Sequence, residues 1–225
     1  MKTIIRENAP VNQAIMDKFL AMKDVLSLSC VLTDAQWRNN AMRETMRPRS
    51  VNKRVIGPAL TVKLTPGDIV DCLVIFKLAR LGDVVVIDAF GESETSIWGG
   101  LMSGLARSAG VVGAVIDGSC RDADEAKLLD FPVYSTHMSP RSAHTAISGR
   151  KEPIEINVPI VCGGVIVNPG DLVVADECGV VIAPSADLEE IYERAYDQAA
   201  KEQAAREDIL KGTTVEELLA KYGRI

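Results

Sequence analysis

This 225-residue chain has few aromatic residues and no excess of positive charge. Phe, Trp and Tyr make up 4% of the residues, and 31 acidic side chains outnumber 25 basic ones, for a net charge of −6 and an isoelectric point of about 5.1. Nucleic-acid binding needs clustered Lys and Arg, and single-strand binders also use aromatic rings on which bases stack. We therefore expect no nucleic-acid partner.

Histidine is nearly absent, since His137 and His144 are the only two, which is too few for a His-rich transition-metal centre. Each of them is interpreted as an acid–base group or as polar loop surface. The five cysteines are widely separated and never form a Cys-x-x-Cys pair, which fits neither a disulfide framework nor a zinc knuckle. They are Cys30, Cys72, Cys120, Cys162 and Cys178. This usage indicates a reducing, cytoplasmic location.

Long hydrophobic runs are also missing, because no apolar run reaches the ~18 residues that a membrane helix needs. The first residues, MKTIIRENAPVNQ, carry charges and a proline where a signal peptide has its apolar core. With 47% hydrophobic and 25% charged residues, the chain is typical of one globular domain spanning residues 1–225, without a membrane partner.

The first fifty residues predict two helices. Apolar residues recur at helical spacing from about 11 to 29, which predicts the first. The second is expected within 33–50, with Thr33 or Asp34 as its N-cap. This second segment carries four arginines, which fit either a solvated face or an anion-contacting edge at a subunit boundary. They are Arg38, Arg43, Arg47 and Arg49.

From Val55 onward, short β-branched runs alternate with Gly and Pro, which predicts an α/β fold with a β-rich second half. Strands are expected at 61–64, at 84–88 and within VVGAVIDG, and further strands follow Val158 between GG, NPGD and DECG turns. The core then covers about 55–184. A long charged helix and the small helix TVEELLAKYG form a C-terminal extension over about 185–225.

Two of the expected strands lead into loops of unusual composition. The strand VVVID leads through a polar loop to the run Gly99 to Met102, and VVGAVID leads to the run Gly118 to Asp122. Because parallel neighbouring strands end at one sheet edge, both loops should face one pocket. The first amides of the helix after Gly99 would point at a carboxylate or phosphate; alternatively, the two glycines only allow close helix packing.

The second loop combines one arginine with three carboxylates. Arg121 can hold a planar carboxylate with two hydrogen bonds, or pair only with its acidic neighbours. Asp122 is either the cap of the next helix or, with Asp124 and Glu125 beside it, a ligand of a hard divalent cation such as Mg²⁺. Asp122 and Glu125, three residues apart, would share one helix face. Asp117, which ends the strand, is interpreted as a helper or a turn former.

Two further side chains are weaker candidates. Arg141 could reach a second anionic group of a substrate or be a solvated loop residue. Cys120 lies beside the expected site, but the sequence places no histidine to activate it, so nucleophilic catalysis is not expected.

The spacing Gly-x20-Arg-Asp-x2-(Asp/Glu), formed by Gly100, Arg121-Asp122 and Glu125, resembles that of the class II pyruvate aldolases of the 4-hydroxy-4-methyl-2-oxoglutarate and 4-carboxy-4-hydroxy-2-oxoadipate type. These aldolases belong to a wider family resembling the regulator of ribonuclease activity A. The likeness covers roughly Val55 to Pro184 and includes IGPALTV, GDVVVID, WGGLMSGLARSAGVVGAVIDG, RDADE and INVPIVCGGVIVNPGDLVVADECGVVIAP.

The resemblance implies a central β-sandwich or barrel-like core flanked by helices, a homotrimer or homohexamer, and active sites between subunits. It implies a small anionic 2-oxo acid substrate and Mg²⁺ or Mn²⁺, held by Asp122 directly and by Glu125 through water. Arg121 and Asp122 would be catalytic. The substrate would be bound by Gly99, Gly100, Leu101, Met102 and Arg121.

An enzyme of this kind cleaves a 4-hydroxy-2-oxo acid between C3 and C4 and leaves a pyruvate enolate, whose negative charge the cation and Arg121 would stabilise. Oxaloacetate gives the same enolate when it loses CO₂, so oxaloacetate decarboxylase activity is also expected. The base for the C4 hydroxyl is a bound water or a carboxylate of a neighbouring subunit, such as Glu44.

The chain departs from the family pattern at 33–38 and 69–72, where it reads TDAQWR and IVDC, and these segments could shape the distal end of the pocket. The alternative function, from the regulator branch, is a non-catalytic protein that binds a ribonuclease or helicase. A methyltransferase is not expected, because no Gly-rich nucleotide-type turn follows an early strand.

Overall fold

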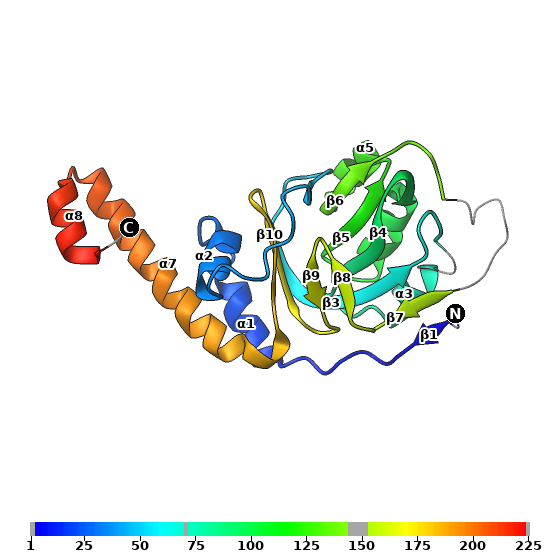
Figure 1. Cartoon of the computed structure of the whole chain (residues 1–225), viewed down its shortest axis with the longest axis horizontal. Coiled ribbons are helices and arrows are strands. Elements are labelled where there is room, and N and C mark those ends of the chain that lie inside the picture. The colour runs from blue at the N-terminus through cyan, green and yellow to red at the C-terminus, as the bar shows by residue number, and fades with distance from the viewer. Residues whose placement is uncertain (1–2, 70–71, 144–152, 224–225) are drawn as a thin grey trace.

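The computed structural model describes residues 3–69, 72–143 and 153–223. A strongly curved sheet forms the centre, and a helical layer with a projecting helical arm lies on one side of it (Figure 1). The strands are β1 (Ile4–Ile5), β2 (Arg47–Pro48), β3 (Val55–Leu64), β4 (Val84–Trp98), β5 (Gly113–Cys120), β6 (Val133–Met138), β7 (Ile154–Ile156), β8 (Ile160–Cys162), β9 (Val165–Val167), β10 (Leu172–Asp176) and β11 (Gly179–Ala183). The α-helices are α1 (Gln13–Ala21), α2 (Leu28–Ala35), α3 (Ile75–Leu78), α4 (Gly100–Ser108), α5 (Ala123–Leu128), α7 (Leu188–Leu210) and α8 (Val215–Tyr222).

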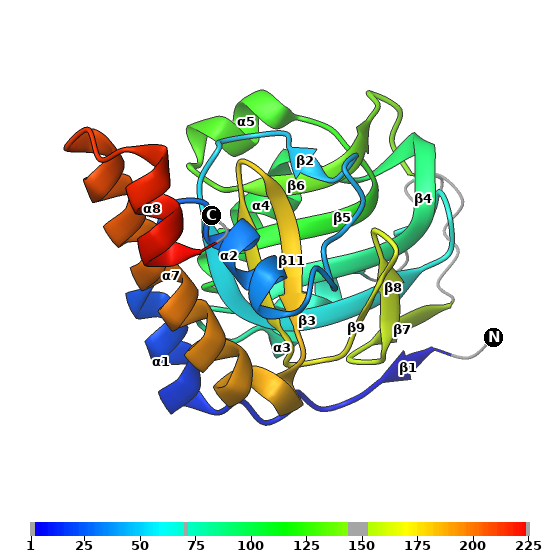
Figure 2. The same ribbon diagram turned by 60° about the vertical axis from the view of Figure 1, so that its left-hand side comes forward.

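Strand β3 joins two parts of the sheet. Its first half, Val55 to Pro58, pairs antiparallel with β10, and its second half, Ala59 to Lys63, pairs parallel with β4. From there β4, β5 and β6 continue in parallel, in the order β1-β7-β3-β4-β5-β6-β2. The sheet therefore folds over on itself, and the antiparallel pairs β10–β11 and β8–β9 cover one face of the parallel strands (Figure 2).

Three apolar cores hold these layers together. One lies between the sheet and α3, α4 and α5, a second between the parallel strands and the β8 to β11 region, and a third packs α1, α2 and α7 against β10 and β11. The valine- and isoleucine-rich strands are buried on both faces, which is why they read as continuous apolar runs. The predicted α/β fold with a central β core flanked by helices is confirmed.

The structure corrects the helices predicted for the first fifty residues. The helix expected over 11–29 is two helices, α1 and α2, separated by turns. The helix expected within 33–50 is wrong, because Thr33 and Asp34 lie in the last turn of α2. The Thr33 hydroxyl donates to the Ser29 carbonyl at 2.9 Å instead of capping a new helix. Beyond it the chain leaves helical geometry, with positive φ at Trp37, Arg38 and Asn40.

Three arginines within residues 33–50 form hydrogen bonds with distant parts of the chain. Arg43 donates to the Asp117 carboxylate at 2.9 Å, and Arg47 donates to the Cys178 carbonyl at 2.9 Å. Arg49 donates to two carbonyls of β6, at 2.9 and 2.8 Å. These guanidinium groups bond the segment between α2 and β3 to β5, to β6 and to the turn between β10 and β11. They therefore form structural contacts rather than a purely solvated face.

Strand β4 is longer than predicted. It continues from the expected 84–88 through the polar residues as far as Trp98, with register shifts against β5 after Asp88, Glu92 and Ser96. Between β3 and β4, a 3₁₀ turn at Cys72–Val74 leads into the four residues of α3. The predicted NPGD turn forms, with positive φ at Gly170, and Pro66-Gly67-Asp68 forms a similar turn with positive φ at Gly67.

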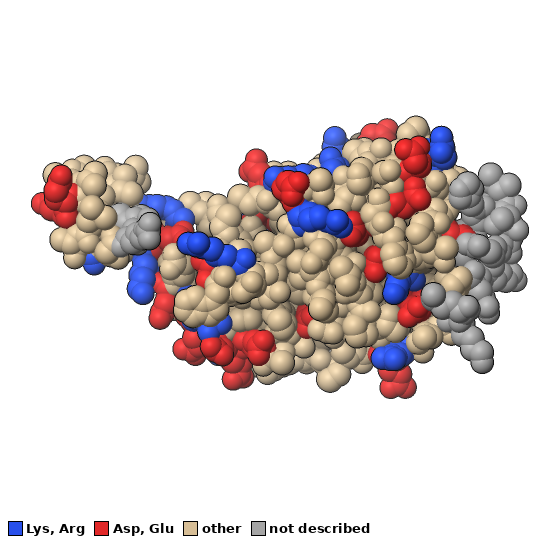
Figure 3. Space-filling view, in the orientation of Figure 1, with Lys and Arg blue, Asp and Glu red and all other residues tan. Residues whose placement is uncertain are grey.

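The two C-terminal helices form as predicted. Leu188, Ile191 and Ala195 of α7 are buried, and Thr214 begins α8 with a capping box to Glu217. Within the described residues, no helix is both long enough and apolar enough to span a bilayer. Acidic and basic side chains are interspersed over the face shown in Figure 3, without a continuous basic band.

The contact between α7 and α8 should depend on pH. Asp208 of α7 accepts hydrogen bonds from Lys221 at 2.6 Å and from Tyr222 at 2.8 Å, and with Lys211 these lower the pKa of Asp208 to about 2. Because the folded pKa lies below the unfolded value of about 3.9, this contact stabilises α8 above about pH 4 and weakens as the pH falls towards 2.

We expect NMR signals of the Tyr222 ring to shift in that pH window, and Asp208→Asn to remove the shift. The buried Tyr134 ring is the control for global unfolding. A Tyr222 transition that merely coincides with that of Tyr134, or that persists in Asp208→Asn, would contradict the assignment.

Candidate functional site

The two loops singled out in the sequence lie side by side at the ends of β4 and β5. The last residues of these parallel strands, Trp98 and Cys120, are register partners. The Arg121 amide donates to the Trp98 carbonyl at 2.9 Å, so the two loops leave the sheet side by side. The prediction that both loops open at one sheet edge is therefore confirmed.

The two glycines bring the first loop against the carboxylates of the second. A Cβ at Gly99 would lie 2.6 Å from Asp122 Oδ2, and one at Gly100 would lie 1.9 Å from Glu125 Oε2. A Cβ at either position would therefore displace the Asp122 or Glu125 side chain from where it lies. The Gly100 amide also donates to Asp122 Oδ2 at 3.2 Å. Glycine here serves close approach between the loops as well as helix packing.

Asp122 does not cap helix α5. It has the cap position, but its φ is 53° and its side chain makes no capping hydrogen bond. Its carboxylate turns instead towards Gly100 and lies 3.4 Å from Arg121 Nε. A left-handed backbone at a non-glycine residue costs on the order of 1 kcal/mol, and this geometry aims the carboxylate at the neighbouring loop. The cap interpretation is wrong for this residue.

Arg121 and Asp122 remain reachable from solvent, with side chains 41% and 40% exposed. Helix α4 begins at Gly100, and its cap residue Gly99 has no side chain to bond the first amides. The Leu101 and Met102 amides therefore remain available donors at the positive end of the helix. A cavity of about 610 Å³ lies between α4 and α5; Gly100, Leu101 and Glu125 line it, but Arg121 and Asp122 do not.

The donor set suits a hard divalent cation that keeps most of its waters. Asp122 and Glu125 lie against the same pair of glycines, and Asp124 is exposed in the first turn of α5. Over residues 3–69, 72–143 and 153–223, no three His, Cys, Asp or Glu side chains gather closely enough to enclose a metal. Mg²⁺ and similar cations commonly take one or two carboxylates plus water, which is what these two acids offer.

The weaker candidates lie apart from this arrangement. His137 is exposed and its Nδ1 is 3.0 Å from the Thr136 hydroxyl, while Arg141 forms a solvent-exposed ion pair with Glu94 at 3.6 Å. His144 lies outside the described residues. Burial raises the pKa of the Cys120 thiol, which contacts Ser135 Oγ at 3.1 Å. Its burial fits the expectation that it is not a nucleophile.

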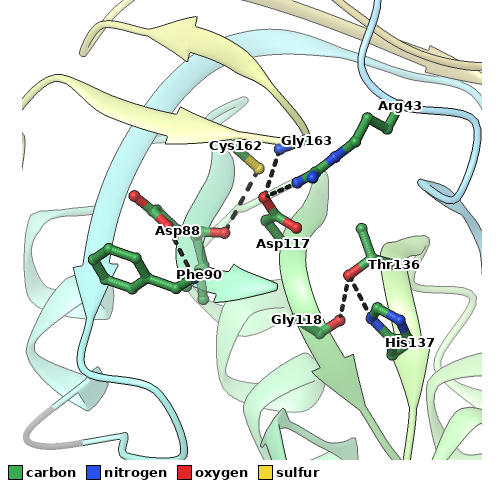
Figure 4. Close-up of polar contacts among 10 residues, drawn as sticks. Arg43, Asp88, Phe90, Asp117, Gly118, Thr136, His137, Cys162 and Gly163 are labelled. Atoms are coloured by element: carbon green, nitrogen blue, oxygen red, sulfur yellow. Dashed lines mark hydrogen bonds and ion pairs between the residues drawn. The ribbon is translucent and has the colours of Figure 1, made fainter. Parts of the chain in front are cut away.

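A second polar cluster lies further back along the same strands, on the face covered by β8 and β9 (Figure 4). Lys63, Asp88 and Asp117 are register partners on β3, β4 and β5. Asp117 Oδ2 accepts from Arg43 and from the Gly163 amide, each at 2.9 Å, while Asp117 Oδ1 is buried without a hydrogen-bond partner in the described residues.

Sequence reasoning named Asp117 but missed the rest of this cluster. Both strands carry the same Ile-Asp pair after an apolar run, in VVVID and AVID, and that repetition is the signal that could have placed Asp88 beside Asp117. Burial raises the pKa of Asp88, and the nearby Asp117 adds to this, whereas the Phe90 and Val161 amides and Lys63 oppose it. A cavity of about 500 Å³ opens beside these groups.

We expect Asp117→Ala to destabilise the fold by about 2–4 kcal/mol, because it leaves the buried Gly163 amide unpaired and releases Arg43. Urea unfolding followed by circular dichroism measures this loss.

Glu94→Ala, which removes one member of an exposed pair, is the matched control and should change stability by less than about 1 kcal/mol. Equal unfolding midpoints for Asp117→Ala and the unmodified protein would contradict the structural role assigned to Asp117.

The family model described as RraA-like, Aldolase/RraA, matches residues 14–182. A protein of Halalkalibacterium halodurans, provisionally named 4-hydroxy-4-methyl-2-oxoglutarate aldolase, is 34% identical over 204 residues, which cover 89% of this chain and 94% of that protein. An uncharacterised protein of Methanocaldococcus jannaschii is 39% identical over 169 residues, covering 74% of this chain and 78% of its own.

Solved structures show the same fold. An uncharacterised protein from Pseudomonas syringae superposes with a TM-score of 0.80 at 26% identity, covering 99% of this chain and all of that one. Streptomyces coelicolor RraAS2, described as an unusual member of the RNase ES inhibitor RraA family, superposes with a TM-score of 0.72 at 26% identity, covering 88% and 98%.

Proposed function

Since the chain belongs to the RraA-like family, described as Aldolase/RraA, we propose that it is a divalent-metal-dependent carbon–carbon lyase. Its substrates are 4-hydroxy-2-oxo di- or tricarboxylic acids such as 4-hydroxy-4-methyl-2-oxoglutarate, which it cleaves to pyruvate and a second oxo acid. Oxaloacetate decarboxylation proceeds at the same site. The provisional aldolase name of the H. halodurans relative supports this choice within the family.

The observation that carries the proposal is the close packing of two loops. Gly99 and Gly100 bring the start of α4 against Asp122 and Glu125, and Arg121 lies beside them. This edge of the sheet holds two carboxylates, which can bind a cation. It also holds a guanidinium group and a helix N-terminus, which can bind an anion. A 2-oxo acid bound to a metal needs both kinds of group together.

The residues divide the work of binding. The Leu101 and Met102 amides hold the carboxylate of the pyruvyl group at the positive end of α4. The Arg121 guanidinium donates to the 2-oxo oxygen and stabilises the negative charge that develops there when the bond between C3 and C4 breaks. The electron pair of that bond ends on the enolate, and the C4 hydroxyl gives up its proton as the second carbonyl forms.

Asp122 would hold the divalent cation, Mg²⁺ or Mn²⁺, directly, and Glu125 would hold it through water. When bound, the cation supplies positive charge to the 2-oxo and carboxylate oxygens of the substrate. Asp122 itself is kept in place by the Gly100 amide, so the same contact that packs the loops also orients the carboxylate. Losing that contact should weaken metal binding and catalysis together.

The helical arm suits an assembly of several copies. The end of α7 and α8 project away from the sheet, and Ile209, Leu210 and Leu219 on them are exposed. A homotrimer or homohexamer would cover these side chains and could bring a neighbour's carboxylate, such as that of the exposed Glu44, to the site as the base for the C4 hydroxyl.

Pyruvate release from oxaloacetate and from 4-hydroxy-4-methyl-2-oxoglutarate tests the proposal. The purified protein should turn over at least one of them with Mg²⁺ or Mn²⁺ and lose that activity in a chelator. Absence of turnover on both, in protein loaded with either metal, would contradict this substrate class.

A non-catalytic regulator that binds a ribonuclease or helicase is the alternative, because the S. coelicolor relative is named as a member of an RNase inhibitor family. Such a protein would bind its partner enzyme equally well with Arg121 or Asp122 replaced.

A further inference from the structure

Two cysteines that the sequence places far apart lie together on the surface. Cys30 belongs to the first turn of α2, and Cys178 belongs to the turn between β10 and β11. Both are free and exposed, whereas the other three cysteines of the chain are buried. The pair lies on elements that are not part of the candidate site, and its chemistry is independent of the proposed lyase function.

One buried carboxylate fixes the backbone on both sides of this pair. Asp176 Oδ2 accepts from the Ser29 amide at 2.9 Å, and Asp176 Oδ1 accepts from the Ser29 hydroxyl at 2.7 Å. The same Oδ1 accepts from the Cys178 amide at 3.0 Å. Asp176 is 6% exposed, so these bonds are sheltered from water. Asp176 thus holds both Ser29, the residue before Cys30, and the backbone of Cys178.

Further contacts bring the thiols together. Arg47 donates to the Cys178 carbonyl at 2.9 Å, which holds the turn from its other side. The Cys178 thiol contributes to raising the pKa of the Cys30 thiol, which places the two side chains close together. A disulfide requires the two Cβ atoms to lie roughly 4 Å apart. Because Asp176 holds Ser29 and the Cys178 amide together, the two thiols need little movement to join.

We propose that Cys30 and Cys178 form a reversible disulfide whose oxidant is a low-molecular-weight disulfide of the glutathione type. One thiolate of the pair attacks the small disulfide, displaces one of its sulfurs as a thiol and forms a mixed disulfide. The second thiolate then attacks the protein sulfur of that intermediate and displaces the other small thiol. Two protein thiols are oxidised, one small disulfide is reduced to two thiols, and these take up the two protons.

The surroundings set the order of attack. Burial raises the pKa of Cys30, the neighbouring Cys178 and Asp176 add to this, and the Ser29 hydroxyl opposes it, so Cys30 is slow to become a thiolate. Cys178 is therefore the attacking residue and Cys30 the resolving one. The resulting bond would fasten α2, and with it the helical layer, to the β10–β11 turn of the sandwich.

The test is oxidation of the full native chain with excess glutathione disulfide, followed by alkylation of the remaining thiols, intact mass measurement and peptide mapping. We expect the chain to lose two hydrogens, to show a Cys30–Cys178 linked peptide, to melt several degrees higher, and to return to the starting mass with dithiothreitol. Cys30→Ser should keep one glutathione on Cys178, and Cys178→Ser should take up glutathione on Cys30 more slowly.

Three results would overturn the proposal. One is stable attachment of two glutathione groups, on Cys30 and on Cys178 of the same chain, which would show that the thiols cannot reach each other. Another is a disulfide between chains, seen on a non-reducing gel. The third is complete resistance of both thiols to oxidation in the folded protein. The variants replace exposed side chains, and circular dichroism confirms that they fold.

Discussion

Arg121→Ala should lower the rate of metal-dependent pyruvate release by about 10²–10³-fold, the usual loss when one donor to a developing oxyanion is removed. The loss should appear mainly in kcat, since the negative charge on the 2-oxo oxygen grows as the bond between C3 and C4 breaks. Arg121 is 41% exposed and pairs only with its neighbour Asp122, so its removal leaves the fold intact. Steady-state kinetics on oxaloacetate measure the effect.

Asp122→Ala should cost at least as much, and part of its loss should be recovered at high Mn²⁺ concentration if the carboxylate holds the cation. Lys127→Ala, on the exposed side of the same short helix, is the matched control and should keep full activity. Activity in Arg121→Ala equal to that of Lys127→Ala would contradict the role assigned to the guanidinium.

Gly100→Ala should strongly lower activity and destabilise the protein. The added Cβ would lie 1.9 Å from Glu125 Oε2 and 2.2 Å from Glu125 Cδ, so the Glu125 side chain or the start of α4 must move. A shift of α4 moves the amide that bonds Asp122, and a swing of the Glu125 side chain takes that carboxylate away from the loop. We expect activity to fall by about 10²-fold or more, since displacements near 1 Å cost that much in an oriented site.

Gly104→Ala provides the control on the same helix. A Cβ at Gly104 would meet only Leu129 Cδ1 at 3.8 Å, an ordinary contact. This variant should keep its activity and gain about 0.5–1 kcal/mol, because alanine is the better helix former. The double change Gly100→Ala with Glu125→Ala removes the clash and should recover stability without recovering full activity. Full activity in Gly100→Ala alone would show that close packing of the two loops is not needed.

The sequence predicts the edge of the sheet well because local patterns determine it. The runs VVVID and VVGAVID are apolar throughout, as strands buried on both faces must be, and their parallel pairing places the following loops together. In the structure, the residues of this spacing meet, because the Glu125 side chain and the loop of Arg121 lie against the backbone at Gly99 and Gly100. The long helix α7 likewise follows from its apolar face.

Other features depend on contacts between distant residues and have no local signal. The segment after α2 has helix-forming residues, yet positive φ at Trp37 and Arg38 ends the helix, and Arg43 and Arg47 bond across the sandwich instead. Asp122 looks like a helix cap in sequence, but its carboxylate bonds the neighbouring loop. Tertiary packing decides each of these cases, as it does for the pairing of Cys30 with Cys178.

The central claim is that this edge of the sheet generates a pyruvate enolate. Exchange of the methyl protons of pyruvate for deuterium tests it without knowledge of the natural substrate, because an enolate forms each time a proton leaves C3. Followed by NMR in D₂O, the protein with Mg²⁺ or Mn²⁺ should exchange these protons, and chelator or Arg121→Ala should suppress the exchange. A rate no faster than that of buffer with the same metal would contradict the claim and favour the non-catalytic regulator.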